Sequence, residues 1–387
     1  MKRRILVLNE RDPRNPLTGG AETHVFEIFS RLVRRGHDVT LLAAGFPGSA
    51  REEVVDGVRV RRFANRYFYY FLVPWIARRE AARGCDAVVD VLNKLPFLSP
   101  WFVPRPCMAI VHHLFGTTAF RQVPAPVAIV TWLMERLIPF AYARVPILAI
   151  SPSTKEDLIA RGIDGRNIHV VPPGVDKATH RALDDGLHRE PLVVWIGRLE
   201  PYKRADVAID AMTAVISSIP AARLVIIGAG SARASLEAHV QGRGLQERVR
   251  FTGFVSEEEK IRWIQNAAVV VQTSEKEGWG MTMIEASICN TVPIASNVEG
   301  LRDSVRNEET GLLVPYGDPA ALAAAIVRVL TDSGLCARLV AGGRAWSERF
   351  GWDEVADDAL SLIEETIAPG VRPLVLHASF PTGPDVR

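Results

Sequence analysis

The sequence predicts an α/β protein built from two doubly wound, Rossmann-like domains. Short apolar runs, typical of buried parallel strands, alternate along most of the chain with longer segments whose apolar residues recur at helical spacing. A length of 387 residues suits two domains, and 48% hydrophobic residues supply a core for each. This alternation favours parallel sheets that are covered by helices on both faces.

The first half begins with a strand rather than a targeting segment. The apolar run that follows Lys2-Arg3-Arg4 is too short for a signal peptide, and the polar residues from Asn9 to Asp12 end it. We predict strands at 4–8, 38–43, 87–91, 107–111 and 146–150, and helices near 20–35, 68–83, 127–142 and 153–161.

The second half carries two clear helix starts. Ser256 and Glu259 form a capping box, and Asp318 stands before Pro319 at a first helical position. We predict strands at 192–196, 223–227, 249–251, 268–272, 292–295 and 312–314, and helices near 205–217, 231–242, 256–266, 282–289, 319–331 and 335–349.

The segment Val171-Pro172-Pro173-Gly174 interrupts this alternation and marks the domain junction. We therefore predict domains at 1–172 and 173–351, followed by a helix at 352–368. The tail at 369–387 is rich in Pro and Gly and is expected to be loosely held.

The net charge excludes few functions, whereas the cysteine pattern indicates a reducing compartment. The formal net charge of +2 argues neither for nor against nucleic acid. No stretch reaches the roughly 20 apolar residues that a membrane span needs. The cysteines show neither metal-ligand spacing nor a disulfide framework, which fits a reducing cytoplasm. They are Cys85, Cys107, Cys289 and Cys336.

The run from Glu277 to Glu285 is the most informative part of the chain. Gly278 and Gly280 follow the first acid and allow close approach of the backbone to a ligand. A helix that starts near Thr282 would point its free N–H groups at the same loop, which suits an anion. Both carboxylates are suited to sugar or ribose hydroxyls, and a solvated helix face is the structural alternative.

Two cations occur upstream, after another predicted strand. The run from Val193 ends at Gly197, and Arg198 and Lys203 follow before the next helix. They would lie at the carboxyl end of a strand, where open α/β sheets bind ligands. Two cations there suit a diphosphate, because they neutralise charge that develops on a leaving phosphate. The alternative is a pair of ordinary surface cations.

Together these motifs make the chain resemble the retaining glycosyltransferases of family 4, once called group 1. The resemblance covers most of the chain in the family's order and implies the GT-B fold. In that fold, two Rossmann-like domains have a cleft between them, and a C-terminal helix crosses back to the first domain. The matching segments are Gly19-Gly20-Ala21-Glu22, His112, Pro173-Gly174-Val175-Asp176, Gly197-Arg198 with Lys203, Gly253-Phe254-Val255, the run Glu277 to Glu285, Gly300-Leu301-Arg302-Asp303, Thr310 to Val314, and Phe350-Gly351-Trp352.

The resemblance implies that the second domain binds a nucleotide diphospho-sugar. Arg198 and Lys203 would bind and balance the leaving diphosphate, Glu277 would hold the transferred sugar, and Glu285 the ribose. The base would meet the backbone at Phe254-Val255. No Asp-x-Asp ends a predicted strand, so no metal or other cofactor is expected. Further donor-binding positions are Gly19, Gly20, Gly197, Phe254, Val255, Gly278, Trp279, Gly280 and Met281.

The first domain is expected to supply the acceptor side. Gly19-Gly20 permits close approach to a phosphate, although a flexible turn is the alternative. His112 follows a predicted strand, and in the family the matching histidine touches the transferred sugar. His113 is the fallback, because side chains alternate along a strand. Asn93 is a weaker acceptor-side candidate, as is Asp90.

Three positions depart from the family pattern. Arg204 stands where Gly is common after the lysine, so that loop is expected to differ. Asn290 replaces a usual Gly, but Asn tolerates the left-handed conformation and the turn should survive. Asp303 is shorter than the commoner Glu.

The segment from Arg66 to Trp75 is dense in aromatic residues, and Arg78-Arg79 follow it. A basic aromatic helix can lie on a membrane surface, as several relatives do to reach lipid acceptors. We favour the alternative, a helix packed in the core with solvated arginines, and keep peripheral membrane contact open.

The resulting expectation is a cytoplasmic hexosyltransferase that retains anomeric configuration. Its partners would be a UDP-, GDP- or ADP-sugar and an acceptor glycan, lipid-linked glycan or small aglycone, without nucleic acid. A GT-B epimerase or phosphorylase is the alternative, and the paired cations and carboxylates argue against a non-catalytic binding subunit. A nicotinamide-dependent oxidoreductase is weakly suggested by Gly228-Ala229-Gly230, but Arg233 stands at the third glycine position.

Overall fold

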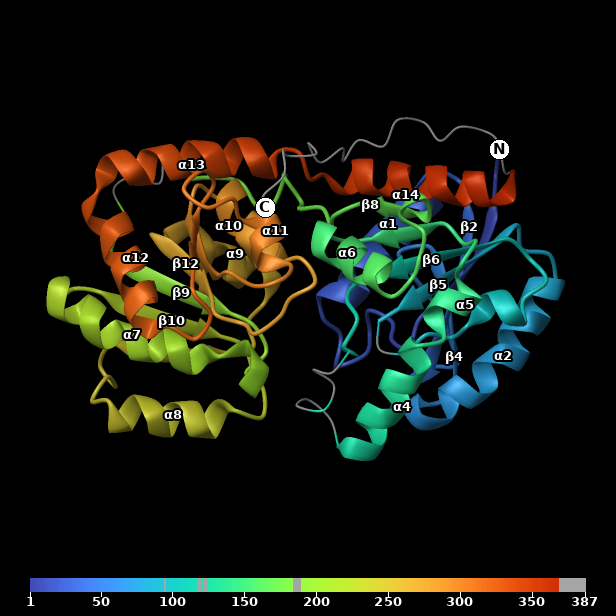
Figure 1. The fold of residues 1–387 in the computed structure, drawn as a ribbon, viewed down its shortest axis with the longest axis horizontal. Helices are drawn as coiled ribbons and strands as arrows, with labels where there is room; N and C mark the ends of the chain where they lie inside the picture. Colours follow the sequence, from blue (N-terminus) through green and yellow to red (C-terminus); the bar gives the residue numbers. More distant parts are fainter. Residues whose placement is uncertain (94, 117–119, 121–123, 184–188, 369–387) are drawn as a thin grey trace. The chain divides into compact units, whose positions relative to one another are not determined.

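The computed structural model describes residues 1–93, 95–116, 120, 124–183 and 189–368, and it divides into two compact units (Figure 1). The first unit comprises Met1–Gly174 together with the segment that begins at Trp352, and the second comprises Val175–Gly351. The predicted junction at 172/173 falls just before this division. The predicted tail at 369–387 lies outside the described residues.

The first unit is built on an eight-stranded sheet of order β3-β4-β2-β1-β5-β6-β7-β8. Neighbouring strands pair in parallel, except for the antiparallel pair β3–β4. The strands are β1 Arg4–Leu8, β2 Asp38–Gly45, β3 Glu52–Val55, β4 Val58–Asn65, β5 Ala87–Leu92, β6 Cys107–Val111, β7 Ile147–Ala149 and β8 Ile168–Val170. The α-helices are α1 Gly20–Arg34, α2 Arg66–Ala82, α4 Ala125–Glu135, α5 Ile138–Ala141, α6 Pro152–Ala160 and α14 Trp352–Ile367.

Helices cover both faces of this sheet. Tyr69 and Val73 of α2 and Ile138 of α5 join one core cluster with alternate residues of the central strands. On the other face α1 packs against α14, and α14 also contacts β5 and β6. Arg35 and Asp357 tie these two helices together, with Nη1 and Oδ1 2.6 Å apart. The predicted return of the C-terminal helix to the first domain is thus confirmed.

The second unit is a six-stranded, all-parallel sheet of order β11-β10-β9-β12-β13-β14. Helices α7, α8, α12 and α13 share its largest core cluster, while α9 and α10 contact strands β9, β12 and β13. The strands are β9 Leu192–Ile196, β10 Arg223–Ile227, β11 Val249–Gly253, β12 Val269–Gln272, β13 Val292–Ser296 and β14 Leu312–Val314. The α-helices are α7 Ala205–Ser218, α8 Arg233–Gly242, α9 Glu257–Asn266, α10 Met281–Ile288, α11 Leu301–Ser304, α12 Pro319–Thr331 and α13 Ser333–Ser347.

The predicted helix starts in this unit are confirmed. Ser256 Oγ accepts a hydrogen bond from the N–H of Glu259 at 3.2 Å. Asp318 Oδ1 accepts one from the N–H of Ala321 at 2.9 Å, with proline at the first helical position. The local capping signals therefore decided where α9 and α12 begin.

The sequence analysis missed β8 and the hairpin of β3 and β4, and it joined two helices. The hairpin turns at Asp56-Gly57, where both residues have positive φ, a signal that precedes alternating apolar residues. The helix predicted at 127–142 is broken into α4 and α5. Pro139 explains the break, because it has no N–H to bond the carbonyl of Glu135.

The favoured expectation that the aromatic segment packs in the core is wrong for most of its rings. Helix α2 buries Tyr69, while Phe68, Phe71 and Trp75 are 62%, 75% and 81% exposed. The helix therefore presents an aromatic face away from its own core.

No single helix in the described part of the chain is both long and apolar enough to cross a membrane. Helices α12 and α13 reach the length and composition only as a pair, bent by 98°.

Candidate functional site

The strand order of the second unit brings two loops to one point. Strand β9 has β10 on one side and β12 on the other, so the chain changes direction across the sheet there. The loops that follow β9 and β12 both leave from the carboxyl ends of these parallel strands, where open α/β sheets bind ligands. Lys203 follows β9 and Glu277 follows β12.

Lys203 and Glu277 form the centre of this site. Lys203 Nζ lies 2.5 Å from Glu277 Oε1, and both side chains are mostly buried. The same oxygen accepts hydrogen bonds from Gln272 Nε2 at 3.1 Å and from Ser274 Oγ at 2.7 Å. These donors come from the end of β12 and the start of its loop, so the carboxylate is held before any ligand is present.

Arg198 lies on the same loop as Lys203 but is exposed. Its Nη2 donates to the hydroxyl of Tyr202 at 3.3 Å. Beneath the loop, Thr273 Oγ1 donates to the Arg204 carbonyl at 2.7 Å and accepts from Trp195 Nε1 at 3.1 Å. The buried indole of β9 and the threonine after β12 thus fix the loop that carries both cations.

Helix α10 starts at Met281, as its glycine-rich approach predicts. Gly280 precedes it with a φ of +87°, a left-handed conformation that favours glycine. Trp279 is 2% exposed and meets Phe350 edge to face, with ring centroids 5.3 Å apart, so only its backbone is available to a ligand. The short run from Gly278 therefore offers N–H groups rather than side chains.

Gly300 allows the Glu277 loop to take this course. Its φ is +79°, and a Cβ there would lie 2.2 Å from the carbonyl oxygen of Glu277. The N–H of Glu277 donates to the carbonyl of Glu299 at 3.3 Å. The backbone at Glu299 and Gly300 thus packs directly against the backbone of Glu277.

The glycines that suggested a dinucleotide site serve packing instead. A Cβ on Gly228 would lie 1.9 Å from the carbonyl oxygen of Gly197, and one on Gly230 would lie 2.3 Å from that of Leu199. The N–H of Ala232 donates to the Leu199 carbonyl at 2.8 Å. These contacts account for both glycines without a cofactor. The backbone at Gly228 thus passes directly against the carbonyl of Gly197.

The predicted base-binding residues follow β11. Gly253 ends the strand with a φ of +77°, and Phe254 is 88% exposed, with Val255 half-buried. Their backbone is therefore accessible at the carboxyl end of the sheet, two strands away from β9.

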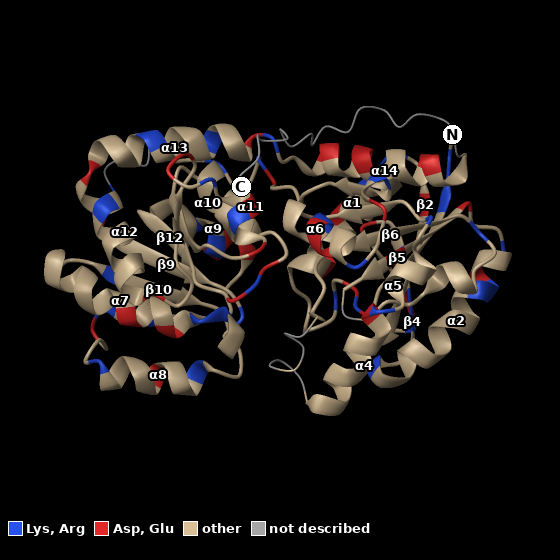
Figure 2. Ribbon diagram, in the orientation of Figure 1, with Lys and Arg blue, Asp and Glu red and all other residues tan. Residues whose placement is uncertain are grey.

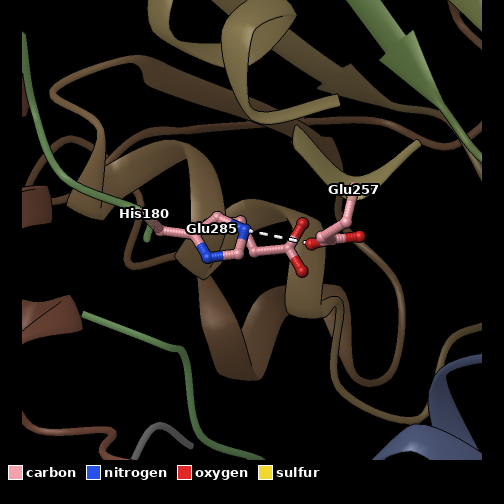
Figure 3. Close-up of side chains that lie close together, drawn as sticks. All are labelled: His180, Glu257 and Glu285. Atoms are coloured by element: carbon pink, nitrogen blue, oxygen red, sulfur yellow. Dashed lines mark ion pairs between the residues drawn. The ribbon is translucent and has the colours of Figure 1, made fainter. Parts of the chain in front are cut away.

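Glu285 lies in α10 and is paired with a residue that sequence analysis did not select. Its Oε2 is 3.0 Å from Lys260 Nζ, and the same ammonium is 2.7 Å from Glu257 Oε1. His180 completes the group, as Figure 3 shows, with Nε2 3.4 Å from Glu257 Oε1. Ligand atoms of His180, Glu257 and Glu285 lie within 4.8 Å of one another, a spacing that could hold a metal ion. The ammonium of Lys260 already supplies positive charge between the two carboxylates.

In the first unit, the predicted glycines stand at the start of α1. The N–H of Gly19 donates to Glu22 Oε2 at 2.9 Å, and Gly20 is the first helical residue. Asn93 Nδ2 donates to Glu22 Oε1 at 3.1 Å. Asn93 follows β5, the strand beside β1, so Glu22 links the two loops at this sheet's own point of reversal. Asp90 is fully buried and accepts from the Tyr142 hydroxyl at 2.5 Å, which makes it a core residue rather than an acceptor contact.

His112 is buried, whereas its neighbour His113 is half-buried against the ring of Phe115. His112 Nε2 lies 3.0 Å from Nδ1 of His24, a fully buried residue of α1. Burial lowers the pKa of His24 to about 3. Burial, with His24 and His113 nearby, holds the pKa of His112 well below its ordinary value. Both rings are therefore neutral at neutral pH.

At two of the three positions that depart from the family pattern, Asn290 and Arg204, the backbone keeps the conformation that glycine would adopt. Asn290 has a φ of +57°, so the expected left-handed turn is confirmed. Arg204 has a φ of +52°, and its guanidinium donates to both carboxylate oxygens of Asp206, from Nε to Oδ1 and from Nη2 to Oδ2. The loop thus keeps a left-handed residue before α7, where an arginine costs on the order of 1 kcal/mol more than glycine. Asp303 lies in α11.

Sequence analysis missed several residues that hold the selected ones. Gln272 and Ser274 flank the loop of Glu277, and their closeness in sequence was a usable signal. Glu22 stands at the third position of α1, where a capping carboxylate is common. No sequence pattern pairs His24 with His112 or Lys260 with Glu285, because tertiary packing makes those contacts.

Comparison with known proteins agrees with this architecture. Residues 18–179 match the family described as Glycosyltransferase Family 4, and residues 176–346 match Glycosyl transferases group 1. A D-inositol 3-phosphate glycosyltransferase of Xylanimonas cellulosilytica is 31% identical over 383 residues, which cover 87% of this chain and 89% of that protein. The chain therefore belongs to the family 4 (group 1) glycosyltransferases. It is an enzyme of the hexosyltransferase type.

Solved structures confirm the fold. A sucrose-phosphate synthase from Thermosynechococcus elongatus superimposes with a TM-score of 0.78 at 24% identity, covering 95% of this chain and all of that one (100%). HepE from Anabaena, in complex with UDP and glucose, superimposes with a TM-score of 0.74 at 19% identity, covering 94% and 100%. The GT-B fold predicted from sequence is thus confirmed.

The neutral histidine pair predicts a loss of stability in acid. The pKa of His24 is depressed on folding, so the unfolded chain binds more protons between pH 6.5 and about 3. Folding stability should therefore be unaffected above pH 6.5 and fall below it, by up to about 1.4 kcal/mol per pH unit for one such proton. In His24→Asn the thermal midpoint should fall less steeply than in the wild type between pH 6.5 and 4. Parallel pH profiles of the two proteins would contradict the assignment.

Proposed function

We propose that the enzyme transfers a hexosyl group from a nucleoside diphosphate sugar to an acceptor hydroxyl, with retention of configuration and without a metal ion. The observation that carries the proposal is the contact of Lys203 with Glu277 at the ends of β9 and β12. The bond from the anomeric carbon to the diphosphate breaks, the acceptor oxygen bonds to that carbon, and the proton of the acceptor hydroxyl passes to the departing diphosphate. Charge then grows on the diphosphate, and a cation held beside it lowers the barrier.

Each side chain takes a distinct part in this proposal. Lys203 and the exposed Arg198 meet the diphosphate, with the backbone N–H groups at the start of α10. Glu277, held by Gln272 and Ser274, accepts from hydroxyls of the transferred sugar. Glu285 accepts from the ribose. His112 meets the sugar through its backbone, because His24 occupies its Nε2 and its Nδ1 is buried.

Two features support chemistry without a metal. Lys203 and Arg198 supply positive charge on the loop that would face the diphosphate. At Glu285, the ammonium of Lys260 takes the position in which a divalent ion would balance the carboxylates. Excess chelator is therefore expected to leave turnover unchanged.

The nucleotide is the first part of the donor to establish. Thermal shift should be measured with UDP, GDP, ADP and NAD and with the nucleotide sugars, in excess EDTA. One nucleoside diphosphate should stabilise the protein, by about 2.7 kcal/mol at one hundred times its dissociation constant. Stabilisation by NAD alone, or by no nucleotide, would overturn the proposal.

The same donor then defines the reaction by NMR of its products. Acceptors should include D-inositol 3-phosphate, which the name of the Xylanimonas cellulosilytica relative gives as its acceptor, and lipid-linked glycans. A new glycoside with the donor's anomeric configuration supports the proposal. Conversion of the donor without an acceptor would indicate an epimerase, and release of sugar phosphate on addition of phosphate would indicate a phosphorylase.

Lys203→Ala should lower kcat by roughly a hundredfold or more, because it removes charge that stabilises the leaving diphosphate. Lys276→Ala is the matched control. It removes a lysine of the Glu277 loop that pairs instead with Glu299 at 2.8 Å, and kcat should be nearly unchanged. Near-normal kcat in a folded Lys203→Ala protein would rule out the role of Lys203.

The acceptor side of the proposal includes contact with a membrane surface. The aromatic face of α2 is flanked by exposed Arg66, Arg78 and Arg79, and the acid Glu80 is already bound to Arg61 and Arg83. Helix α4 adds exposed aliphatic side chains and, as Figure 2 shows, carries little charge along its length. Helices α2 and α5, the latter directly after α4, pack on the same core cluster. The aromatic face of α2 with its basic margin matches an anionic lipid surface, and the apolar exposed side of α4 has the same character.

Vesicle binding tests this contact. The wild type should cosediment with phosphatidylcholine vesicles that contain phosphatidylglycerol, and less so in high salt. The double variant Phe71→Ser/Trp75→Ser should bind at least about tenfold more weakly, because both rings lose apolar burial. Ile159→Ser on α6, also an exposed apolar residue, should bind like the wild type. Absence of wild-type binding, or equal binding by the double variant, would remove the membrane from the proposal.

A further inference from the structure

Glu285 ends a row of four charged or titratable side chains, of which Figure 3 draws His180, Glu257 and Glu285, and the fourth is Lys260. The row runs from His180 to Glu257, from Glu257 to Lys260, and from Lys260 to Glu285. The three contacts measure 3.4, 2.7 and 3.0 Å. The lysine and Glu285 side chains at its inner end are only 17% and 10% exposed.

Two helices bring these groups together. Helix α9 begins at Glu257, capped by Ser256, and Lys260 follows one turn later on the same side. Glu285 is in the second turn of α10, which contacts α9. The lysine stem can therefore lie along apolar neighbours while its ammonium reaches the carboxylate of the adjacent helix.

Neighbouring charges shift the pKa values of Lys260 and Glu257. Burial opposes the charged ammonium, but Glu285 and Glu257 outweigh it and raise the pKa of Lys260. Burial also opposes ionisation of Glu257, yet His180 and Lys260 lower its pKa to about 2. The ammonium thus stays charged between two carboxylates throughout the neutral range.

The contact leaves one edge of Glu285 for a ligand. Oε2 is buried and forms an ion pair with the ammonium of Lys260 at 3.0 Å without a hydrogen bond, and among the described residues no hydrogen bond reaches Oε1. A carboxylate with one oxygen held by a cation cannot rotate freely, so its other oxygen keeps a fixed direction. A buried ion pair contributes little to folding compared with an apolar pair of the same size. The ion pair instead fixes the orientation of the Glu285 carboxylate. An apolar residue at position 260 would not do so.

We propose that Lys260 is a positioning residue for nucleotide binding, which fixes the carboxylate of Glu285 so that it accepts from the ribose hydroxyls. Glu257 and His180 hold the ammonium from the other side. The inference rests on the proposed function, since it concerns the nucleotide site at Glu285. It names a residue that acts through Glu285 and does not itself touch the donor.

The test compares nucleotides with and without ribose hydroxyls. Calorimetry with UDP, GDP and ADP identifies the tightest ligand of the wild type, and its 2′,3′-dideoxy form is then titrated in parallel. The wild type should bind the dideoxy form about tenfold more weakly, the effect of a lost hydrogen bond to a charged group. In Lys260→Met, affinity for the parent nucleotide should fall about tenfold, and the ratio between the two ligands should approach one.

Four further variants separate positioning from folding. Lys260→Arg should restore most of the ratio, because it keeps a cation. Lys260→Gln retains polarity and replaces the Met variant if that protein does not fold. Glu285→Gln combined with Lys260→Met should behave like Glu285→Gln alone, since the lysine acts through the carboxylate. Arg328→Met, which removes the ion pair of Arg328 with Glu308 in the same unit, should leave the ratio unchanged.

The outcomes distinguish failure of the positioning role of Lys260 from failure of the ribose role of Glu285. A collapsed ratio in Glu285→Gln with a wild-type ratio in both Lys260→Met and Lys260→Gln overturns the positioning role alone. A wild-type ratio in Glu285→Gln, or binding of no nucleotide by the wild type, overturns the ribose role in the proposed function and this inference with it.

Discussion

The parallel pairing of β9 with both β10 and β12 is the constraint on which the candidate site depends. It sends the chain to opposite sides of one central strand and leaves the loops after β9 and β12 side by side. Lys203 and Glu277 are 74 residues apart in sequence, yet their charged atoms lie 2.5 Å from each other. Gly300 makes room for the Glu277 loop. Trp195 and Thr273 hold the loop after β9.

Glycines make this arrangement of loops sterically possible. Gly228 and Gly230 admit the loop after β9, and Gly300 admits the carbonyl of Glu277, at separations where any Cβ would overlap with backbone. The neighbouring Thr273 and Trp195 then fix the loop by hydrogen bonds. Backbone proximity, more than side-chain charge, thus decides where the carboxylates and cations of the site can stand.

In each unit, one mostly buried charged residue contacts polar partners from several elements. Glu22 gathers the N-terminus of α1 and Asn93 in one unit, and Lys260 gathers Glu257 and Glu285 in the other. In each group the charged side chains find partners on different elements, which offsets part of the cost of burying them, although Glu285 Oε2 and His180 Nε2 have ion-pair contacts without a hydrogen bond. On α2, by contrast, Phe68, Phe71 and Trp75 remain exposed in the described part of the chain.

The sequence by itself determined the class and the order of most elements, and it selected the candidate site residues that the structure brings together around Lys203 and Glu277. Apolar periodicity, the caps at Ser256 and Asp318, and the glycines around Glu277 are local signals, and local signals can be interpreted without coordinates. The tertiary structure alone decided which faces are exposed and which distant residues pair. The aromatic residues of α2 follow a helical pattern whether they face core or solvent, so periodicity could not assign the side. Likewise His24 with His112, and Lys260 with Glu285, meet only because strand order and helix packing bring separate segments together.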